Sequence, residues 1–531
     1  MSGDETRVRT LDRTLTDEVR ESPVDRQERR TRRRLLLLLA LVVIAVVIGW
    51  LVRRFTADRP VEYADIGEHF KYGSIGAEPG GSLTAPIGGV LPPYWVFKVL
   101  PEICPEKLPG GYASLGMLYE PGHDLPVGVS RRWRLGFDQV GLNCAVCHTG
   151  TVRETPASRP QLVLGMPANQ LDIRRLFGFI LDCSLDERLT ADNLLGKIAA
   201  AGGDLGTLDR ALYRLALVNQ VKLTTLKLQR RIGILLQDDV TPWGAGRVDT
   251  FNPYKSIQFN WPLERLPHDE LIGASDYPSL WNQKARAQSL PQAPDGMWLH
   301  WDGNNNSVDE RNLSASLGAG VTPTTIDHAA LKRVRDWAWT LPPPRYPFAV
   351  DDALAARGEP LYRQYCSDCH ADHHFREGQA VGSRVGTVTP IADIGTDPFR
   401  LHSYTSTFAA NQYDLYPGSP YRFHHFRKTN GYANQPLDGI WARAPYLHNG
   451  SVPTMRDLLE PPEKRPARFY RGYDVYDQKR LGFVSGVAAE KGRSYFLYDT
   501  SLPGNGNQGH LFGTQLSPEE KDALVEYLKK F

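Results

Sequence analysis

Two short cysteine motifs constrain this chain more than any other feature of its sequence. Residues 144–148 read Cys-Ala-Val-Cys-His (the first motif) and residues 366–370 read Cys-Ser-Asp-Cys-His (the second motif). Two cysteines in this spacing, followed at once by histidine, are typical of c-type haem attachment. The thiols bond to the two vinyl groups on one porphyrin edge, and the adjoining imidazole reaches the iron. The sequence therefore predicts two covalently bound haem c groups, held by Cys144, Cys147, His148, Cys366, Cys369 and His370.

For a single motif, the alternative is a zinc site or a redox cysteine pair beside an unrelated histidine. Two complete copies in one chain favour haem. The remaining cysteines, Cys104 and Cys183, are free to form a disulfide around the first motif, or to lie as two separately buried thiols.

An apolar run near the N-terminus predicts a membrane helix. Residues 35–52 contain 18 uncharged residues, which is enough to cross a bilayer core. Five arginines lie within residues 29–34 and two follow the run, so the N-terminal side is expected to be cytoplasmic. We expect an uncleaved single-pass anchor in the inner membrane, with the rest of the chain in the periplasm. A cleaved signal peptide is the alternative, although 34 preceding residues are long for one.

Helix signals divide the rest of the chain. One apolar stripe at 326–341 stops at three prolines, a second at 352–365 leads into the second motif, and Ser517 can cap a closing helix. Residues 151–260 enlarge the first half around a helical core at 207–237. Three Gly/Pro-rich stretches are predicted loops: 73–93, 101–128 and 376–420.

These signals predict a mainly α fold with two cytochrome c-type haem domains and long loops, preceded by one transmembrane helix. The expected parts are a cytoplasmic, arginine-rich and disordered tail (1–34), the anchor (35–52), an N-terminal cytochrome c domain with a large insertion (53–341), a Pro-rich linker (342–351) and a C-terminal cytochrome c domain (352–531).

A histidine in a glycine-rich loop is the first candidate for a sixth iron ligand. His510 ends the stretch 504–510, where glycines allow the backbone to approach a haem face closely. A ligand there would make the second haem six-coordinate and low-spin. The alternative is an exposed loop histidine. The 62 Lys+Arg against 60 Asp+Glu leave a formal charge of +2, which does not favour nucleic acid as a partner.

Further segments resemble bacterial dihaem cytochrome c peroxidases. Residues 441–454 resemble their Ala-Pro-Tyr-x-His-x-Gly-Ser stretch, and residues 276–282 and 300–303 look like two other segments of that family. Within the superfamily, residues 69–76, 140–144 and 500–505 are most similar to the branch that contains the dihaem rubber oxygenases.

The resemblance implies roles for several side chains. Trp301 falls where the peroxidases place a tryptophan between the haems; the alternative is an aromatic packing residue. His510 falls near the family's distal ligand of the C-terminal haem. His448 matches a histidine near the haem that is not a ligand. A calcium ion between the domains is a further property of the peroxidases.

The sequence also departs from the peroxidase pattern. Residues 317–325 lack the carboxylate that those enzymes use in peroxide cleavage. For the first haem the resemblance leaves two alternatives. His268 can be a removable distal ligand, or the sixth position is open under an aromatic cover, for which Phe251 and Trp243 are candidates.

Our leading hypothesis is an oxidoreductase in which the first haem activates dioxygen or a peroxide, while the second transfers electrons. The resemblance adds an apolar, unsaturated substrate and a redox partner protein. The competing hypotheses are a pure electron-transfer cytochrome in a periplasmic chain and an enzyme that oxidises residues of one partner protein.

Overall fold

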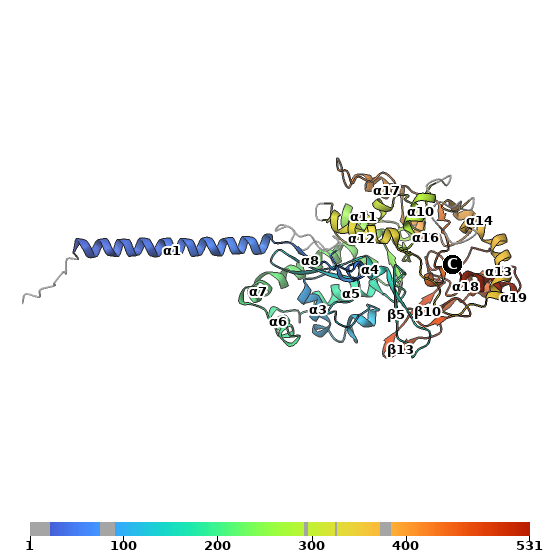
Figure 1. Ribbon diagram of the computed structural model, residues 1–531, viewed down its shortest axis with the longest axis horizontal. Helices are drawn as coiled ribbons and strands as arrows, with labels where there is room; N and C mark the ends of the chain where they lie inside the picture. The colour runs from blue at the N-terminus through green and yellow to red at the C-terminus, as the bar shows by residue number, and fades with distance from the viewer. Residues whose placement is uncertain (1–21, 75–90, 291–295, 324–325, 372–383) are drawn as a thin grey trace, which may run out of the picture. The chain divides into compact units, whose positions relative to one another are not determined.

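The computed structural model describes residues 22–74, 91–290, 296–323, 326–371 and 384–531 (Figure 1). Residues 1–57 and residues 58–531 form two separate compact units. The predicted linker at 342–351 lies inside the second unit, so the division into two cytochrome domains stays a prediction.

The first unit contains one long helix, α1 (Pro23–Thr56). Ser22 caps it, because the Ser22 Oγ accepts a hydrogen bond from the backbone N–H of Asp25 at 3.1 Å. The helix is long and apolar enough to span a membrane, a test that a signal sequence also meets. Residues 23–34 were expected to be disordered and are helical instead, since the cap starts the helix well before the apolar run. The tail residues 1–21 lie outside the described residues.

The second unit has helices at all four places where the sequence predicts them, which are 207–237, 326–341, 352–365 and the segment after Ser517, and further helices elsewhere. Those before the second motif are α2 (Ile66–Tyr72), α3 (Tyr94–Ile103), α4 (Cys144–Cys147), α5 (Ile173–Ser184), α6 (Ala191–Ala200), α7 (Thr207–Leu212), α8 (Val218–Ile232), α9 (Asn252–Phe259), α10 (Gln283–Ser289), α11 (Val308–Gly318), α12 (His328–Thr340) and α13 (Asp352–Tyr365). The remainder are α14 (Ser367–His370), α15 (Ile391–Ile394), α16 (Phe399–Ser403), α17 (Ser406–Tyr413), α18 (Met455–Leu458) and α19 (Pro518–Leu528).

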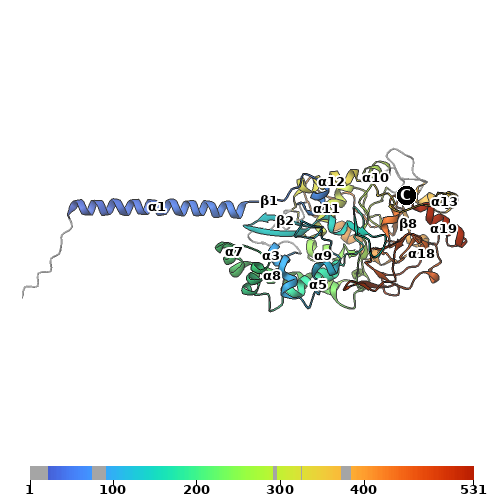
Figure 2. The ribbon, with the colours of Figure 1, turned by 60° about the horizontal axis from the view of Figure 1, so that its bottom comes forward.

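The fold is mixed rather than mainly α, because short antiparallel sheets connect its loops. Strands β1 (Arg59–Pro60), β2 (Val129–Arg134) and β3 (Phe137–Leu142) form one sheet beside α3 (Figure 2). The two-stranded sheets pair β4 (Thr149–Val152) with β5 (Gln161–Leu164), β6 (Arg247–Asp249) with β7 (Ala274–Asp276), β8 (Val388–Pro390) with β9 (Gly431–Ala433), β10 (Arg468–Arg471) with β15 (Phe496–Asp499), β11 (Tyr476–Asp477) with β12 (Gly482–Phe483), and β13 (Ala489–Glu490) with β14 (Arg493–Ser494).

Two of the predicted loops contain regular structure. Within 376–420, which was expected to be irregular, strand β8 and the short helices α15, α16 and α17 form, and the last turn of α3 enters the predicted loop at 101–128. Helices α15 to α17 are each too short to show the apolar periodicity from which a helix is recognised. Residues 75–90 and 376–383 of the predicted loops lie outside the described residues.

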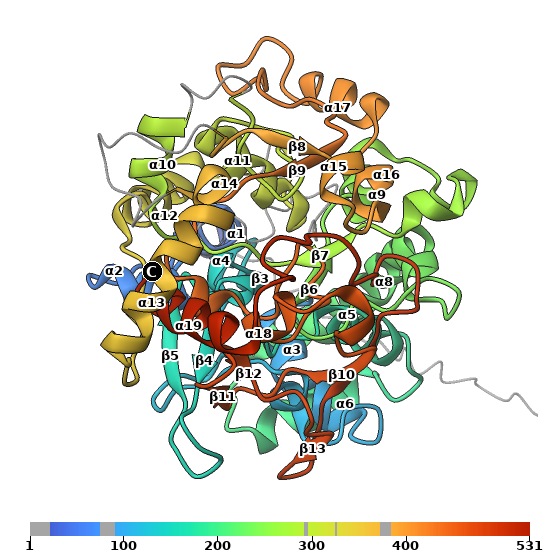
Figure 3. The same ribbon diagram turned by 90° about the vertical axis from the view of Figure 1, so that its right-hand side faces the viewer.

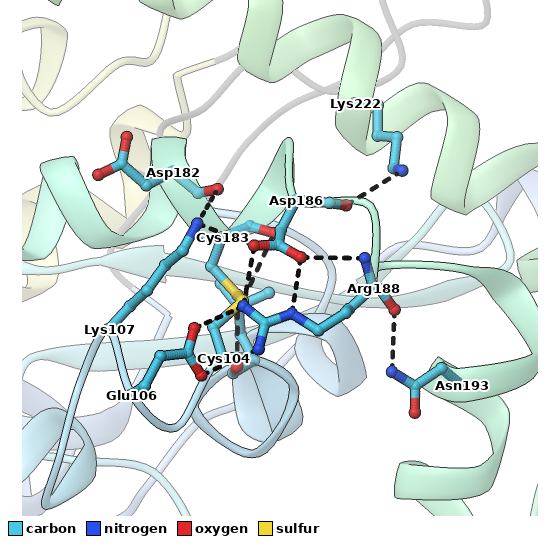
Figure 4. A network of polar contacts seen from close by, with 10 residues as sticks. Cys104, Glu106, Lys107, Asp182, Cys183, Asp186, Arg188, Asn193 and Lys222 are labelled. Atoms are coloured by element: carbon cyan, nitrogen blue, oxygen red, sulfur yellow. Dashed lines mark hydrogen bonds and ion pairs between the residues drawn. A yellow bond between two sulfur atoms is a disulfide. The ribbon is translucent and has the colours of Figure 1, made fainter.

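The insertion is held to the first part of the unit by a disulfide. Cys104 and Cys183 are bonded to each other, which confirms the predicted pair. A polar network surrounds the bond (Figure 4). Lys107 donates to the Asp186 carboxylate at 2.9 Å, and Arg188 contacts the carboxylates of both Asp186 and Glu106. The insertion therefore packs as part of the main core and not as a separate lobe.

Helices α13 and α19 lie side by side around the second motif (Figures 1 and 3). A capping box at Ser517 and Glu520 starts α19, as the sequence predicts. The two helices approach closely at Gly358, where an added Cβ would lie 2.1 Å from the Ala523 carbonyl oxygen. Only glycine fits this crossing, because the nearest group is backbone and has little room to move.

We expect Gly358→Ala to destabilise the protein by about 1–3 kcal/mol, the usual cost of overpacking a close contact. Thermal unfolding measures this loss. The control is Gly196→Ala in α6, where an added Cβ meets nothing within 4 Å. That variant should gain up to about 1 kcal/mol from helix propensity. Equal effects of the two substitutions would contradict the close crossing.

Candidate functional site

The first motif forms a single helical turn between two apolar clusters. Asn143 caps α4, because its Oδ1 accepts a hydrogen bond from the Ala145 N–H at 2.9 Å. The Asn143 side chain also donates to the Lys71 carbonyl oxygen, which ties the motif to α2. Ala145 packs in a cluster with Phe251, and Val146 packs in the cluster that contains the disulfide.

The imidazole of His148 is oriented by the backbone. Its Nδ1 lies 2.8 Å from the Pro278 carbonyl oxygen. Because a carbonyl oxygen can only accept, Nδ1 must carry the hydrogen, which leaves the lone pair on Nε2. Burial, and then the nearby Arg311, lower the pKa of His148 to about 3, so the ring is neutral. A neutral imidazole with a free Nε2 is the form that binds a metal.

The second motif repeats this arrangement. The Nδ1 of His370 lies 2.6 Å from the Gln435 carbonyl oxygen, and burial lowers the pKa of His370. The hydroxyl of Tyr362 in α13 donates to the Ala371 carbonyl oxygen at 2.6 Å, which holds the end of α14. In both motif histidines the hydrogen therefore lies on Nδ1 and the lone pair on Nε2.

The four motif cysteines carry free thiols, and burial raises the pKa of both Cys147 and Cys366 to about 12. Among the described residues, no group of three or more His, Cys, Asp or Glu side chains could hold a metal ion. In that part of the chain, the zinc alternative therefore lacks a complete ligand set of these residue types.

The structure brings His510 opposite His370. The centroids of the two imidazole rings are 6.3 Å apart. When two histidines bind one metal from opposite sides, each metal–nitrogen bond is about 2 Å long, and each ring centroid lies about 1 Å beyond its nitrogen. The two ring centroids are then roughly 6 Å apart. The pair therefore fits one haem iron between them.

The glycine-rich loop places His510 by a close backbone approach. A Cβ on Gly509 would lie 2.4 Å from the carbonyl carbon of Gly395, and the N–H of His510 donates to the Ile394 carbonyl oxygen. Arg465 donates to the carbonyl oxygen of His510. Burial, and then the neighbouring His370 and Arg465, lower the pKa of His510 to about 3. The ring is therefore neutral and able to act as a ligand.

Trp301 connects the backbone segments that orient the two motif histidines. Its indole Nε1 donates to the Asp276 carbonyl oxygen at 2.7 Å, two residues before Pro278. Its own carbonyl oxygen accepts from the Ala433 N–H at 2.8 Å, two residues before Gln435. A short hydrogen-bonded route thus joins the supports of the two sites through Trp301.

Phe251 is buried in the apolar cluster that contains Ala145. Trp243 is buried in the other cluster, which contains Val146, so the two aromatic rings lie on different sides of the first motif. The Phe251 ring contacts Tyr404, and the guanidinium of Arg400 lies 4.3 Å from its centroid.

The two remaining candidate histidines are placed less favourably for ligation. His268 is exposed, and its Nε2 lies 3.0 Å from the Asp239 carbonyl oxygen. His448 is buried, stacks on Tyr432 and has its Nε2 3.0 Å from the Tyr432 hydroxyl. Among the described residues, neither histidine lies beside a motif histidine as His510 lies beside His370.

Two functional groups are missed by sequence reasoning, namely the carbonyl oxygens of Pro278 and Gln435. Any residue offers a backbone carbonyl, so neither leaves a signal of its own. The position of Pro278 inside the segment 276–282, which resembles a peroxidase motif, is the one hint available.

Comparisons with known proteins support the cytochrome interpretation of the second half. A sequence family described as RoxA-like, cytochrome c-like matches residues 431–470. This segment begins with β9, contains Gln435 and His448, and reaches into β10. A cytochrome c-like region of this kind implies covalently bound haem c.

Two relatives come from Sinorhizobium fredii. The uncharacterized protein y4iM is 33% identical over 299 residues, which cover 48% of this chain and 64% of y4iM. The uncharacterized protein y4iJ is 27% identical over 512 residues, which cover 80% of this chain and 82% of y4iJ. Neither name states an activity. The chain is therefore similar to RoxA-like cytochromes in one segment and to two proteins of unstated function over longer ones.

Proposed function

We propose that residues 58–531 carry two covalent haem c groups and act as an oxidoreductase of the peroxidase and oxygenase type. The observation that carries this proposal is the pair of motif histidines. In each, Nδ1 is bound to a backbone carbonyl and Nε2 is free. Haem iron supplies single-electron chemistry and, at an open coordination position, binding of dioxygen or a peroxide.

The two sites differ in ways that suggest different roles. The ring centroids of His510 and His370 are 6.3 Å apart, a distance that fits one iron between them. This supports a six-coordinate, low-spin electron-transfer site. Among the described residues, no histidine ring pairs in this way with His148. The first site is therefore the place for the oxidant, with Phe251 or Trp243 excluding water from it.

The route through Trp301 supports electron transfer between the sites. It links the carbonyl groups that hold His148 and His370 through two hydrogen bonds and short backbone segments. The substrate we propose is an apolar, unsaturated molecule, since the matched segment is RoxA-like and the resemblance at the sequence level points to rubber oxygenases. A redox partner protein in the periplasm and anchoring of the chain through α1 complete the proposal.

The test counts haems and their spin states. We expect two haem equivalents by pyridine haemochrome assay, retained after acid-acetone extraction because the bonds are covalent. A low-temperature electron paramagnetic resonance spectrum should show one high-spin and one low-spin iron. Two low-spin irons and no uptake of carbon monoxide or cyanide would instead indicate a pure electron carrier. Fewer than two equivalents would contradict the dihaem proposal itself.

We expect His510→Ala to convert the low-spin iron to high-spin, because the ring opposite His370 is lost. Added imidazole should restore the low-spin signal, which a merely structural defect would not allow. The matched control is His448→Ala, which removes another buried histidine of this region and should leave the spin states unchanged. A low-spin signal that survives His510→Ala would assign the ligand to another residue.

We expect Trp301→Phe to slow electron transfer between the haems in a stopped-flow or flash experiment. Loss of the indole N–H also leaves the Asp276 carbonyl without this donor, at a cost of about 1–3 kcal/mol. Trp441→Phe is the control, because Trp441 Nε1 likewise donates to a backbone carbonyl, that of Pro344. Similar stability losses with unequal transfer rates would support the route, and equal rates would argue against it.

A further inference from the structure

Helix α10 presents buried polar groups that have no partner among the residues that the structure describes. Gln283 and Arg286 are one helical turn apart, and both are more than nine-tenths buried. Among the described residues, both side-chain atoms Nε2 and Oε1 of Gln283 lack a hydrogen-bond partner, and so do Nε and Nη2 of Arg286. A buried guanidinium or amide without partners is costly, so these groups point to a ligand that accepts hydrogen bonds.

Arg286 belongs to a group of three enclosed arginines, Arg286, Arg311 and Arg443 (the arginine triad). Arg286 and Arg311 are buried, and the Nε of Arg443 is buried without a partner, although its other nitrogens donate to the carbonyl oxygens of Pro436 and Asp438. Burial, and then the charge of Arg286, lower the pKa of Arg443 to about 9. The charge of Arg286 therefore lies near enough to repel the charges of Arg443 and Arg311.

The carboxylate that offsets this charge is Asp438, which acts on both Arg286 and Arg443. One buried carboxylate against three guanidiniums leaves an excess of positive charge. Such an excess persists inside a protein only when anions balance it.

The triad lies at both haem motifs. Arg311 lies on α11, whose Leu313 packs in one apolar cluster with Ala145 of the first motif. Arg443 donates to the Pro436 carbonyl oxygen, next to the Gln435 carbonyl that holds His370. Arg286 acts on both Arg311 and Arg443. Ala285 of α10 also packs in one apolar cluster with Ala371, which follows His370.

We propose that Gln283 and the arginine triad bind the propionate groups of the two haems, with Arg286 between the haems, Arg443 on the side of the second and Arg311 on the side of the first. This inference rests on the proposed function, because the propionates come with the haems. Each porphyrin bears two carboxylates on the edge opposite its vinyl groups, and these are anions of the kind that the excess of positive charge requires. A guanidinium fork binds a carboxylate through two parallel N–H donors, and the Gln283 amide adds a further donor.

The consequence is a control of reduction potential by these positioning residues. A positive charge held near a haem stabilises the reduced form, which carries one electron more. Arg286 is shared by the two sites, so its removal should lower the potentials of both haems and not of one alone.

The test is a spectroelectrochemical titration of Arg286→Gln in the full-length, haem-loaded protein. We expect the ratio of reduced to oxidised haem at a fixed potential to fall about tenfold, which is about 59 mV for one electron. Arg286→Lys keeps the charge but loses the fork, and should shift the potentials less, in the same direction. Arg210→Gln is the control, because Arg210 is exposed on α7, and it should change nothing.

The haemochrome assay separates the two proposals. A wild-type protein without two haems refutes the proposed function, whereas two haems with unchanged potentials in Arg286→Gln refute the propionate site alone. Should Arg286→Gln fail to accumulate, Arg286→Lys decides the matter by resonance Raman spectroscopy. A change in the propionate bending bands of that variant supports the site, and bands identical to those of the wild type overturn it.

Discussion

The hydrogen bond from each motif histidine to a backbone carbonyl is the interaction on which the rest of the site depends. Pro278 accepts from His148 and Gln435 accepts from His370, at 2.8 and 2.6 Å. Each bond settles which nitrogen carries the hydrogen and how the ring is turned, and leaves the lone pair on Nε2, the atom that we propose as the iron ligand. Because both acceptors are backbone atoms, the orientation of the two imidazoles is set by where the chain passes and not by a second side chain.

The segments that supply these carbonyls are themselves held by Trp301. The indole reaches the Asp276 carbonyl on the side of the first motif, while the Trp301 backbone accepts from Ala433 on the side of the second. One residue thus braces the supports of both histidines. Trp301, which we propose for electron transfer, therefore also contributes to stability. To separate the two roles, the control variant must lose an equivalent indole hydrogen bond to a backbone carbonyl, as Trp441→Phe does.

Much of the fold was predictable because its signals are local. The capping box at Ser517, the three prolines after 341 and the apolar stripe at 352–365 each act on residues within one or two helical turns, and the helices formed there. The small sheets and helices α15 to α17 were missed, because they are too short for periodicity, and helices such as α3, α5, α6 and α11 were not predicted either. The start of α1 at Pro23 was missed because the polar composition of residues 1–34 predicts disorder, whereas the Ser22 cap starts a helix there.

The sequence by itself determined the chemistry of the chain: two thiol pairs each followed by histidine, one apolar run near the N-terminus, and two further cysteines that could pair. The tertiary structure alone decided which groups meet. His510 lies opposite His370 while His268 is exposed, and Arg286 is buried between arginines that are distant in sequence. The physical reason is that residue type sets what a side chain can bind, whereas its partners are brought to it by other segments of the chain, whose packing no local pattern encodes.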